Sequence, residues 1–269
     1  MICFPNAKIN IGLHITRKRS DGFHDLETIF YPVPWCDALE IIPQKESTKT
    51  IYTSGGSDIP GNSSSNLCLK AFDILNQDYN LPPVRLHLHK IIPMGAGLGG
   101  GSSDGAFTLK MLNILFKLGI SEDRLEEYAI RLGSDCPFFI RNKPVFAYGR
   151  GEKFESLDLK LTGYHFLLVK PPQSVSTKEA FSNIIPAEPP VSLKELIQLP
   201  VGEWKEHIHN DFEKTVFPLY PVIGELKNTL YSMGAIYASM SGSGSSVYGI
   251  FKEKTNPGDW FSGCEVFQS

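Results

Sequence analysis

Polar and apolar residues alternate near the start of the chain, a pattern typical of a β-strand. The apolar residues fall at every second position: Ala7, Ile9, Ile11, Leu13 and Ile15. The residues between them are Lys8, Asn10, Gly12 and His14. The alternation predicts a half-buried strand over residues 7–15. Lys8 and Asn10 then share its polar face, about 7 Å apart at a rise of about 3.3 Å per residue.

Similar patterns predict further strands and helices along the chain. Strands are predicted over 26–33, 37–43, 84–91, 145–148 and 164–169, with a hairpin formed by 235–240 and 246–251. Helices are predicted over 66–76, 105–118, 122–132, 177–184, 193–199, 204–212 and 222–233. Ser121 is the expected N-cap of the third helix. Residues 53–65 are rich in Gly, Ser and Asn and are expected to form a loop.

A glycine-rich segment joins a predicted strand to a predicted helix. It consists of Pro93, Met94, Gly95, Ala96, Gly97, Leu98, Gly99, Gly100, Gly101, Ser102 and Ser103. Glycines allow positive φ and a close approach of the backbone to a ligand. The N-terminus of the following helix adds unpaired N–H groups and a positive dipole end. The segment therefore predicts a phosphate-binding loop.

Three other interpretations of this segment are disfavoured. A Walker loop needs a lysine followed by Ser or Thr after its glycines, and this segment has none. Gly95, Gly97 and Gly100 match the dinucleotide pattern GxGxxG. That pattern also needs an acidic residue about 20 positions on, at the end of a second strand, whereas Glu122 and Asp123 are predicted to open a helix. A flexible Gly/Ser linker rarely lies directly between an apolar strand and an amphipathic helix.

Composition and charge exclude several classes of protein. The 269 residues, 42% of them hydrophobic, are enough for one large or two medium domains. A net charge of −3 gives no electrostatic reason to expect nucleic acid or a membrane surface as a partner. No apolar run approaches the about 18 residues of a membrane span, and no signal peptide is evident. Five widely spaced cysteines without a CxxC pair indicate a reduced, cytoplasmic chain.

Three segments together resemble the signatures of the GHMP small-molecule kinases, which transfer the γ-phosphate of ATP to an acceptor, usually a hydroxyl group. They are PNAKIN at 5–10, PMGAGLGGGSS at 93–103 and MSGSGS at 240–245. Four more segments are similar to the members of that family whose acceptor is a cytidine-diphosphate-linked methylerythritol. These are RSDGFHDLET at 19–28, LGSDCPFF at 132–139, GRGE at 149–152 and NDFE at 210–213. The resemblance runs in order along nearly the whole chain.

The resemblance implies an α+β, two-domain GHMP kinase fold. Residues 1–152 would form the N-terminal ATP-binding domain, similar to domain 2 of ribosomal protein S5. Residues 153–269 would form a ferredoxin-like C-terminal domain. The implied reaction is ATP-dependent phosphorylation of the acceptor's 2-hydroxyl, on the non-mevalonate route to isoprenoid precursors. The expected partners are these two small molecules, not nucleic acid or membrane, and the expected state is a cytoplasmic monomer or weak homodimer.

The resemblance assigns the transfer chemistry to Asp135 and Lys8. Asp135 would lie beside the acceptor hydroxyl and take its proton as the oxygen attacks phosphorus. Lys8 beside it would lower the pKa of that carboxylate and stabilise the negative charge that develops on the attacking oxygen and the phosphoryl group. Asn10, on the same strand face, would bind substrate or hold this pair in place.

The resemblance also places the cytosine of the acceptor near Phe23 and His24. The aromatic ring would stack on the base, and the histidine would read the base edge. Many relatives have tyrosine where this chain has Phe23, so stacking is retained without a phenol hydrogen bond. Thr177 and Phe181 are expected to approach the substrate, with Phe181 on the second face of the cytosine.

The triphosphate of ATP is expected to be wrapped by the glycine-rich segment. Ser102, at the start of the following helix, is the candidate ligand of Mg²⁺, an ion that prefers oxygen ligands and keeps most of its waters. Asp104, where some relatives have asparagine, would orient a water on that ion. Residues 241–245 are expected to support the loop. His87 and His89 fall on the polar face of a strand and are interpreted as solvated side chains, not metal ligands.

Two other functions are weighed against this one. A GHMP kinase for homoserine or mevalonate is disfavoured by Phe23 and His24, because those acceptors carry no nucleobase. A catalytically silent sensor with this fold would be expected to have lost Lys8, Asp135 or the glycines, and all of these are present.

Overall fold

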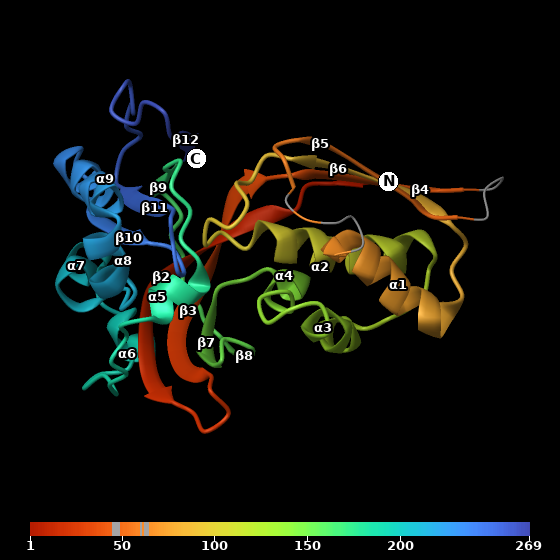
Figure 1. Ribbon diagram of the computed structural model, residues 1–269, viewed down its shortest axis with the longest axis horizontal. Coiled ribbons are helices and arrows are strands. Elements are labelled where there is room, and N and C mark those ends of the chain that lie inside the picture. The colour runs from red at the N-terminus through yellow and green to blue at the C-terminus, as the bar shows by residue number, and fades with distance from the viewer. Residues whose placement is uncertain (45–48, 60, 62–64) are drawn as a thin grey trace. The chain divides into compact units, whose positions relative to one another are not determined.

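The computed structural model describes residues 1–44, 49–59, 61 and 65–269 and forms two compact units (Figure 1). Unit 1 comprises Met1–Ala7, Pro34–Met94 and Gly99–Lys143, and unit 2 comprises Lys8–Val33, Gly95–Leu98 and Pro144–Ser269. Each unit is thus built from several stretches of chain. The division into family domains at 152/153 stays a prediction.

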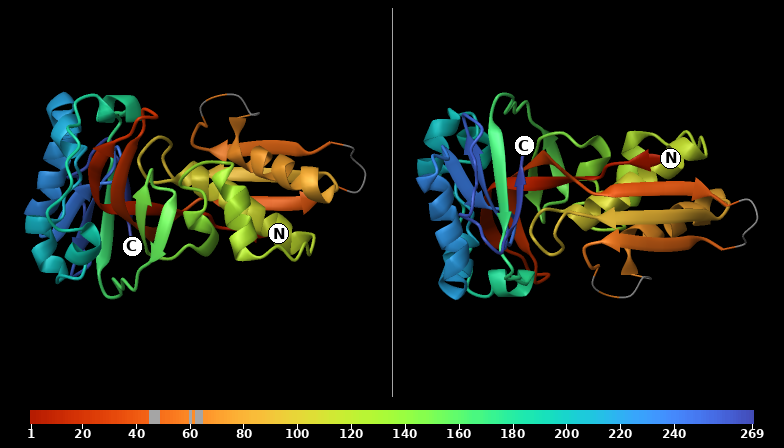
Figure 2. Two further views of the ribbon diagram at one scale, coloured as in Figure 1. Left: turned by 90° about the horizontal axis from the view of Figure 1, so that it is seen from below. Right: turned by 90° about the horizontal axis from the view of Figure 1, so that it is seen from above.

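Unit 1 is a mixed sheet with helices on one of its faces (Figures 1 and 2). The strand order is β1 (Ile2–Cys3), β4 (Ala38–Pro43), β6 (Val84–Lys90) and β5 (Ile51–Gly56), with β5 parallel to β6 and the other pairs antiparallel. The helices are α1 (Leu67–Tyr79), α2 (Gly100–Leu115), α3 (Glu122–Ile130) and α4 (Phe138–Arg141). The predicted N-cap is confirmed, since the Ser121 hydroxyl accepts from the backbone N–H of Arg124.

Two predictions about unit 1 are wrong in part. The expected loop over 53–65 begins with strand β5, which polar and small residues hid from the sequence pattern; residues 60 and 62–64 lie outside the described residues. The helix after the glycines begins at Gly100, not at 105. Glycine is a poor helix former, so local propensity argued against this first turn. Tertiary packing overrides that propensity, because Gly100 is buried.

A buried ion cluster joins β6 to α2. The side chains of β6 alternate, which places Lys90 on the same buried face as Leu86 and Leu88. The Lys90 ammonium donates to Asp104 Oδ2 at 2.8 Å and to Asp37 Oδ2. Asp37 Oδ1 also accepts the backbone N–H of Ile92 at 2.8 Å. Opposite charges that are buried together compensate part of the large cost of removing each from water.

The two carboxylates of this cluster have different surroundings. Asp37 accepts hydrogen bonds through both oxygens, whereas Asp104 Oδ1 is buried and has no hydrogen-bond partner among the described residues. Burial raises the pKa of Asp104 to about 7, although Lys90 acts against this. Burial also opposes the charge on Lys90, but the two carboxylates outweigh it and raise the pKa of the lysine. Burial therefore favours the protonated form of Asp104.

Unit 2 contains two antiparallel sheets. The first has the order β2 (Asn6–Lys18), β3 (His24–Cys36), β7 (Val145–Gly149) and β8 (Lys153–Ser156), and the first residues of β2 and the last of β3 belong to unit 1. The second has the order β10 (Tyr237–Met240), β11 (Val247–Phe251), β9 (His165–Lys170) and β12 (Glu265–Gln268). The helices are α5 (Thr177–Phe181), α6 (Leu193–Leu196), η2 (Val201–Glu203), α7 (Trp204–His207), α8 (Glu213–Leu219) and α9 (Pro221–Ser232).

Strand β2 is more deeply buried than its alternating pattern predicts. All residues from Asn6 to Ile15 are buried, so the prediction of a half-buried strand is wrong. The polar face is covered by other parts of unit 2. Gly12, at φ +66°, lies so close to Leu193 that a Cβ would come within 2.7 Å of its Cδ1 atom. Polar side chains tolerate this burial because they are hydrogen-bonded.

Other elements of unit 2 also differ from the predicted ones. The helix predicted over 204–212 ends at His207, and Asn210 forms a β-bridge with Leu13 instead. Helix α8 was not predicted, because Pro218 inside it is a helix-breaking signal. Strands β8 and β12 are short edge strands without a clear alternation and were also not predicted.

The pH dependence of the free energy of unfolding should reflect the protonation of Asp104. Its pKa in the folded chain, about 7, lies above its ordinary value of 3.8. The folded state therefore binds this proton more tightly, and the free energy of unfolding should fall as pH rises from about 4 to about 7. Asp104→Asn should flatten this part of the curve, measured by urea unfolding at a series of pH values. Asp158→Asn, at an exposed carboxylate, is the control; parallel curves for the Asp104 variant and the parent chain would contradict the assignment.

Candidate active site

Lys8 and Asn10 lie side by side on β2 in unit 2, as the alternation predicts. The Lys8 ammonium donates to Asn10 Oδ1 at 2.6 Å and lies 4.5 Å from the centroid of the Phe30 ring. The Asn10 amide donates to Thr28 Oγ1 at 2.9 Å, and the Thr28 hydroxyl donates to the carbonyl of Gly12 at 2.6 Å. With Lys8 and Asn10 4% and 2% exposed, these contacts hold the ammonium in one orientation.

The segment between β10 and β11 binds the glycine-rich loop directly. Ser241 Oγ donates to the carbonyl of Gly97 at 2.8 Å and accepts the backbone N–H of Asn10 at 3.2 Å. The backbone N–H of Lys8 donates to the carbonyl of Leu98 at 2.9 Å, and that of Ser246 to the carbonyl of Ala96 at 3.3 Å. The predicted support of the loop by this segment is confirmed. One serine thereby links the lysine-bearing strand to the loop.

Glycine is required at position 97, where the glycine-rich loop comes closest to the Ser241 carbonyl. Gly97 has φ +75°, and a Cβ at this position would lie 2.0 Å from the carbonyl oxygen of Ser241. A side chain would therefore both strain the backbone and separate the loop from its support.

The NDFE segment, whose role the sequence did not reveal, supports the same region. The Asn210 amide donates to the carbonyls of Met240 and Gly242 at 2.9 and 2.8 Å. Asp211 Oδ2 accepts a hydrogen bond from the backbone N–H of Ile15 at 2.9 Å. Glu213 Oε1 accepts one from the backbone N–H of Met240, also at 2.9 Å. These polar groups satisfy backbone N–H and carbonyl groups of buried residues. The motif was visible in the sequence, but only the fold shows which carbonyls it binds.

The rest of the loop and Asp135 belong to unit 1. Helix α2 begins after Gly99, which has φ +69° and gives the helix no side-chain cap, so the first-turn N–H groups remain for a ligand. Asp135 is half-buried in the turn before α4. Burial raises the pKa of the Cys136 thiol, next to Asp135 in the sequence, to about 12, so that thiol stays protonated. Pairing of Asp135 with Lys8 stays a prediction.

A pocket of about 280 Å³ in unit 1 opens beside the first turn of α2. Apolar walls come from Leu67, Leu88 and Met94, and polar groups from Tyr52 and Asn66. Gly101 and Asp104 also line it. The size and the mixed lining suit an aromatic heterocycle. Sequence reasoning missed this pocket because its residues come from segments that are far apart along the chain.

The predicted base-binding residues lie in unit 2 near the β2–β3 turn. Phe23 is 56% exposed, and its ring lies under the guanidinium of Arg150 at 5.2 Å. The His24 ring stacks on Phe181 at 4.8 Å, and Phe181 packs edge-on against Phe212. The structure therefore brings His24 and Phe181 together and orients both rings by packing. Thr177 is the exposed first residue of α5.

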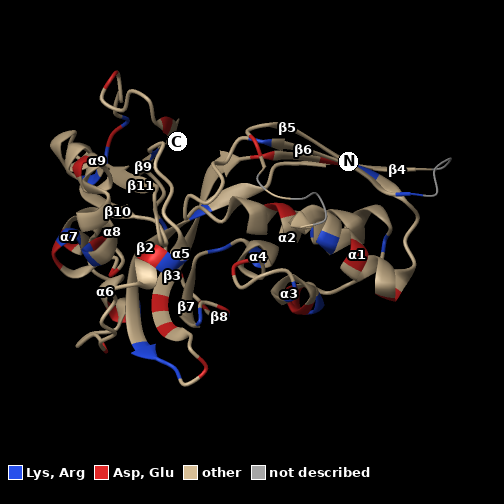
Figure 3. Cartoon of the chain, viewed as in Figure 1, with Lys and Arg blue, Asp and Glu red and all other residues tan. Residues whose placement is uncertain are grey.

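The remaining sequence predictions concern metals, membranes and charge. Within the described ranges, no group of three or more His, Cys, Asp or Glu side chains is arranged to hold a metal ion. None of the helices in the described part of the chain is both long and apolar enough to cross a membrane. Figure 3 shows acidic and basic residues interspersed in both units. All five cysteines are free thiols.

Two family models match the sequence. Residues 66–143 match the GHMP kinases N terminal domain, and residues 192–259 match the GHMP kinases C terminal domain. Together with the α+β architecture, the glycine-rich loop and its lysine-bearing neighbour strand, these matches define a small-molecule kinase. The chain belongs to the GHMP kinase family. The predicted α+β GHMP kinase fold is confirmed.

The relatives point to one particular kinase within the family. A 4-diphosphocytidyl-2-C-methyl-D-erythritol kinase of Bacteroides fragilis is 56% identical over 272 residues, which cover 100% of this chain and 99% of that protein. A crystal structure of a 4-(cytidine 5'-diphospho)-2C-methyl-D-erythritol kinase is 28% identical with a TM-score of 0.78, covering 93% of this chain and 90% of the other. The Methanococcus jannaschii mevalonate kinase, 14% identical with a TM-score of 0.73 over 100% and 97% of the two chains, shares the fold.

Gly97→Ala should destabilise the chain by about 2 kcal/mol or more, because the added Cβ meets the Ser241 carbonyl in a strained backbone region. Urea unfolding measures the change. Gly202→Ala is the matched control, since nothing lies within 4 Å of a Cβ there, and its effect should stay within about 0.5 kcal/mol. Equal stabilities for the two variants would contradict the required close approach.

Proposed function

We propose that this chain transfers the γ-phosphoryl group of ATP to the 2-hydroxyl of 4-CDP-2-C-methyl-D-erythritol, giving the 2-phosphate and ADP. This step belongs to the non-mevalonate, or methylerythritol phosphate, route to isoprenoid precursors. The relatives named above support the acceptor. The observation that carries the proposal is the hydrogen-bonded connection from Lys8 and Asn10 through Ser241 to the glycine-rich loop.

One part of the site would bind ATP, the phosphate donor. Residues 93–103 would hold the triphosphate on backbone N–H groups, with the uncapped first turn of α2 adding its dipole. The pocket lined by Asn66 and Leu67 would take the adenine, since it opens beside that same turn. Its apolar walls would stack on the ring, and its few polar groups would orient it.

Mg²⁺ would accompany the triphosphate, and the residues present fit such an ion. The half-buried Ser102 hydroxyl lies in the first turn of α2, and the neighbouring Ser103 Oγ is buried without a hydrogen-bond partner in the described structure. Hydroxyl oxygens of this kind, with phosphate oxygens and water, are the ligands that Mg²⁺ prefers. When bound, the ion would neutralise phosphate charge. Asp104, buried and bound to Lys90, is a poorer candidate to orient its waters.

The acceptor substrate would be bound mainly by residues at the β2–β3 turn and on α5. Phe23 would stack on one face of the cytosine and Phe181 would approach the other, with His24 at the base edge. The contact between the His24 and Phe181 rings supports their place in one site of unit 2. Thr177, at the start of the same helix as Phe181, would contact the remainder of the substrate.

Asp135 and Lys8 would carry out the transfer. The 2-hydroxyl oxygen forms a bond to the γ-phosphorus as the bond to the bridging oxygen of ADP breaks, and the hydroxyl proton passes to the Asp135 carboxylate. Lys8, held by Asn10 in a buried position, would stabilise the charge on the attacking oxygen and the phosphoryl group. Buried, preorganised charges act strongly because little water competes with them.

The full-length chain should phosphorylate 4-CDP-2-C-methyl-D-erythritol in a coupled ADP-release assay. Asp135→Asn should lower kcat by about 10²–10⁴-fold, because the asparagine amide cannot take up the proton. Asp123→Asn, at an exposed carboxylate on α3, should stay within twofold. Turnover of homoserine or mevalonate without turnover of the cytidine substrate would reject the proposed acceptor, and full activity of the Asp135 variant would reject its role.

His24→Ala should raise KM for the cytidine substrate by about tenfold and leave KM for ATP within twofold. Base stacking and edge contacts are worth about 1–3 kcal/mol, and only the acceptor is proposed to use them. His89→Ala, at an exposed histidine of β6, is the control. If both Michaelis constants rose equally, His24 would not read the base.

We further propose that the chain acts in the cytoplasm as a monomer or weak homodimer. Five free thiols are typical of a reducing compartment. Mass measurement by light scattering over a range of concentrations would test the oligomeric state.

A further inference from the structure

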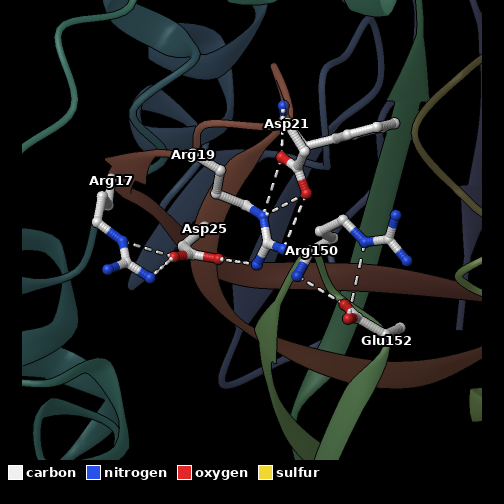
Figure 4. Close-up of polar contacts among 7 residues, drawn as sticks. Arg17, Arg19, Asp21, Asp25, Arg150 and Glu152 are labelled. Carbon is white, nitrogen blue, oxygen red and sulfur yellow. Dashed lines mark hydrogen bonds and ion pairs between the residues drawn. The ribbon is translucent and has the colours of Figure 1, made fainter.

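Ion pairs organise the turn between β2 and β3 (Figure 4). Arg19 binds both Asp21 and Asp25, at 2.9 and 3.0 Å, and Arg17 binds Asp25 at 2.6 Å. Asp21 Oδ1 also accepts the backbone N–H of Phe23 at 3.1 Å. Arg17, near the end of β2, and Arg19, in the turn, are thus paired with carboxylates, and Asp21 fixes the backbone next to the proposed base-stacking ring of Phe23.

Arg150 also lies beside the Phe23 ring, and its carboxylate partner is Glu152. It occupies the turn between β7 and β8, flanked by Gly149 and Gly151, which have φ +72° and +95°. Glu152 Oε2 accepts the backbone N–H of Arg150 at 2.6 Å, and Glu152 Oε1 lies 3.7 Å from the side-chain Nε. The tight turn and the Glu152 carboxylate together fix the backbone of Arg150 and the part of its side chain up to Nε.

The terminal nitrogens of Arg150 remain available to a ligand. In Figure 4 they point away from the Glu152 carboxylate, and no hydrogen-bond acceptor for them occurs among the described residues. The guanidinium lies 5.2 Å from the centroid of the Phe23 ring, and 45% of the Arg150 side chain is exposed. A guanidinium that lies over an aromatic ring keeps its N–H edge free for anions.

We infer that Arg150 recognises the diphosphate of the acceptor substrate, so that the enzyme discriminates a cytidine diphosphate from an uncharged cytidine. The inference rests on the proposed function, which places the cytosine on Phe23. A diphosphate attached to that nucleoside lies within a few bonds of the base. Two N–H groups of one guanidinium match two phosphate oxygens, and such charge-assisted pairs are about twice as strong as neutral hydrogen bonds. Arg150 is then a specificity-determining residue in addition to the base-binding pair.

The geometry also allows a purely structural role, in which Arg150 only supports the ring of Phe23. The two roles predict different ligand dependence. Loss of an anion contact weakens ligands that carry the diphosphate and spares the nucleoside. Loss of ring support weakens every ligand that stacks on Phe23 by the same factor.

Calorimetric titrations of the full-length chain with cytidine and with CDP distinguish these roles. A saturating non-hydrolysable ATP analogue keeps CDP out of the ATP site. Arg150→Met should raise the Kd of CDP about tenfold and change that of cytidine less than twofold. Arg150→Lys, which keeps the charge without the planar fork, should recover part of the loss. Arg131→Met, at an exposed arginine over the Tyr128 ring in unit 1, is the matched control and should change neither constant.

Equal weakening of cytidine and CDP, or no weakening of either, would overturn the inference. A turnover assay distinguishes failure of the inference about Arg150 from failure of the proposed function. If the parent chain phosphorylates the cytidine substrate and Arg150→Met does so with an unchanged KM, only the role of Arg150 fails. If the parent chain shows no such turnover but still prefers CDP over cytidine through Arg150, the proposed reaction fails and the diphosphate contact stands.

Discussion

The close approach of the Ser241 backbone and side chain to Gly97 is the contact on which the candidate site of unit 2 depends. Ser241 Oγ bonds the loop through the Gly97 carbonyl and β2 through the Asn10 N–H. Asn210 holds the carbonyls on either side of Ser241, and the Tyr248 hydroxyl binds the Asn10 carbonyl at 2.8 Å. Loop, lysine strand and supporting segment therefore form one hydrogen-bonded assembly.

Two buried lysines have different surroundings. Lys90 is enclosed with two carboxylates, an arrangement that connects β6 to the first turns of α2. The Lys8 ammonium donates to the Asn10 amide oxygen and lies over the Phe30 ring, and the Lys8 backbone N–H binds the glycine-rich loop at Leu98. Lys90 therefore joins two elements of unit 1, whereas Lys8 lies next to the proposed phosphate-binding loop.

Local sequence patterns predicted the elements whose residues alternate or repeat cleanly. Strand β6 and the N-cap of α3 follow from such signals. The patterns failed where tertiary contacts override local preference. Gly100 and Gly101 enter a helix although glycine disfavours it, and Pro218 lies within α8. The polar side of β2 is buried because later segments of the chain cover it.

The sequence by itself determined the family, the glycine-rich loop and the shared face of Lys8 and Asn10, because each depends on residues that are close along the chain. Only the tertiary structure showed that Asn210 binds the carbonyls beside Ser241, that His24 stacks on Phe181, and that Arg150 lies over Phe23. These contacts join residues more than 20 positions apart. Their partners are chosen by strand pairing and packing of the whole unit, which no local pattern encodes.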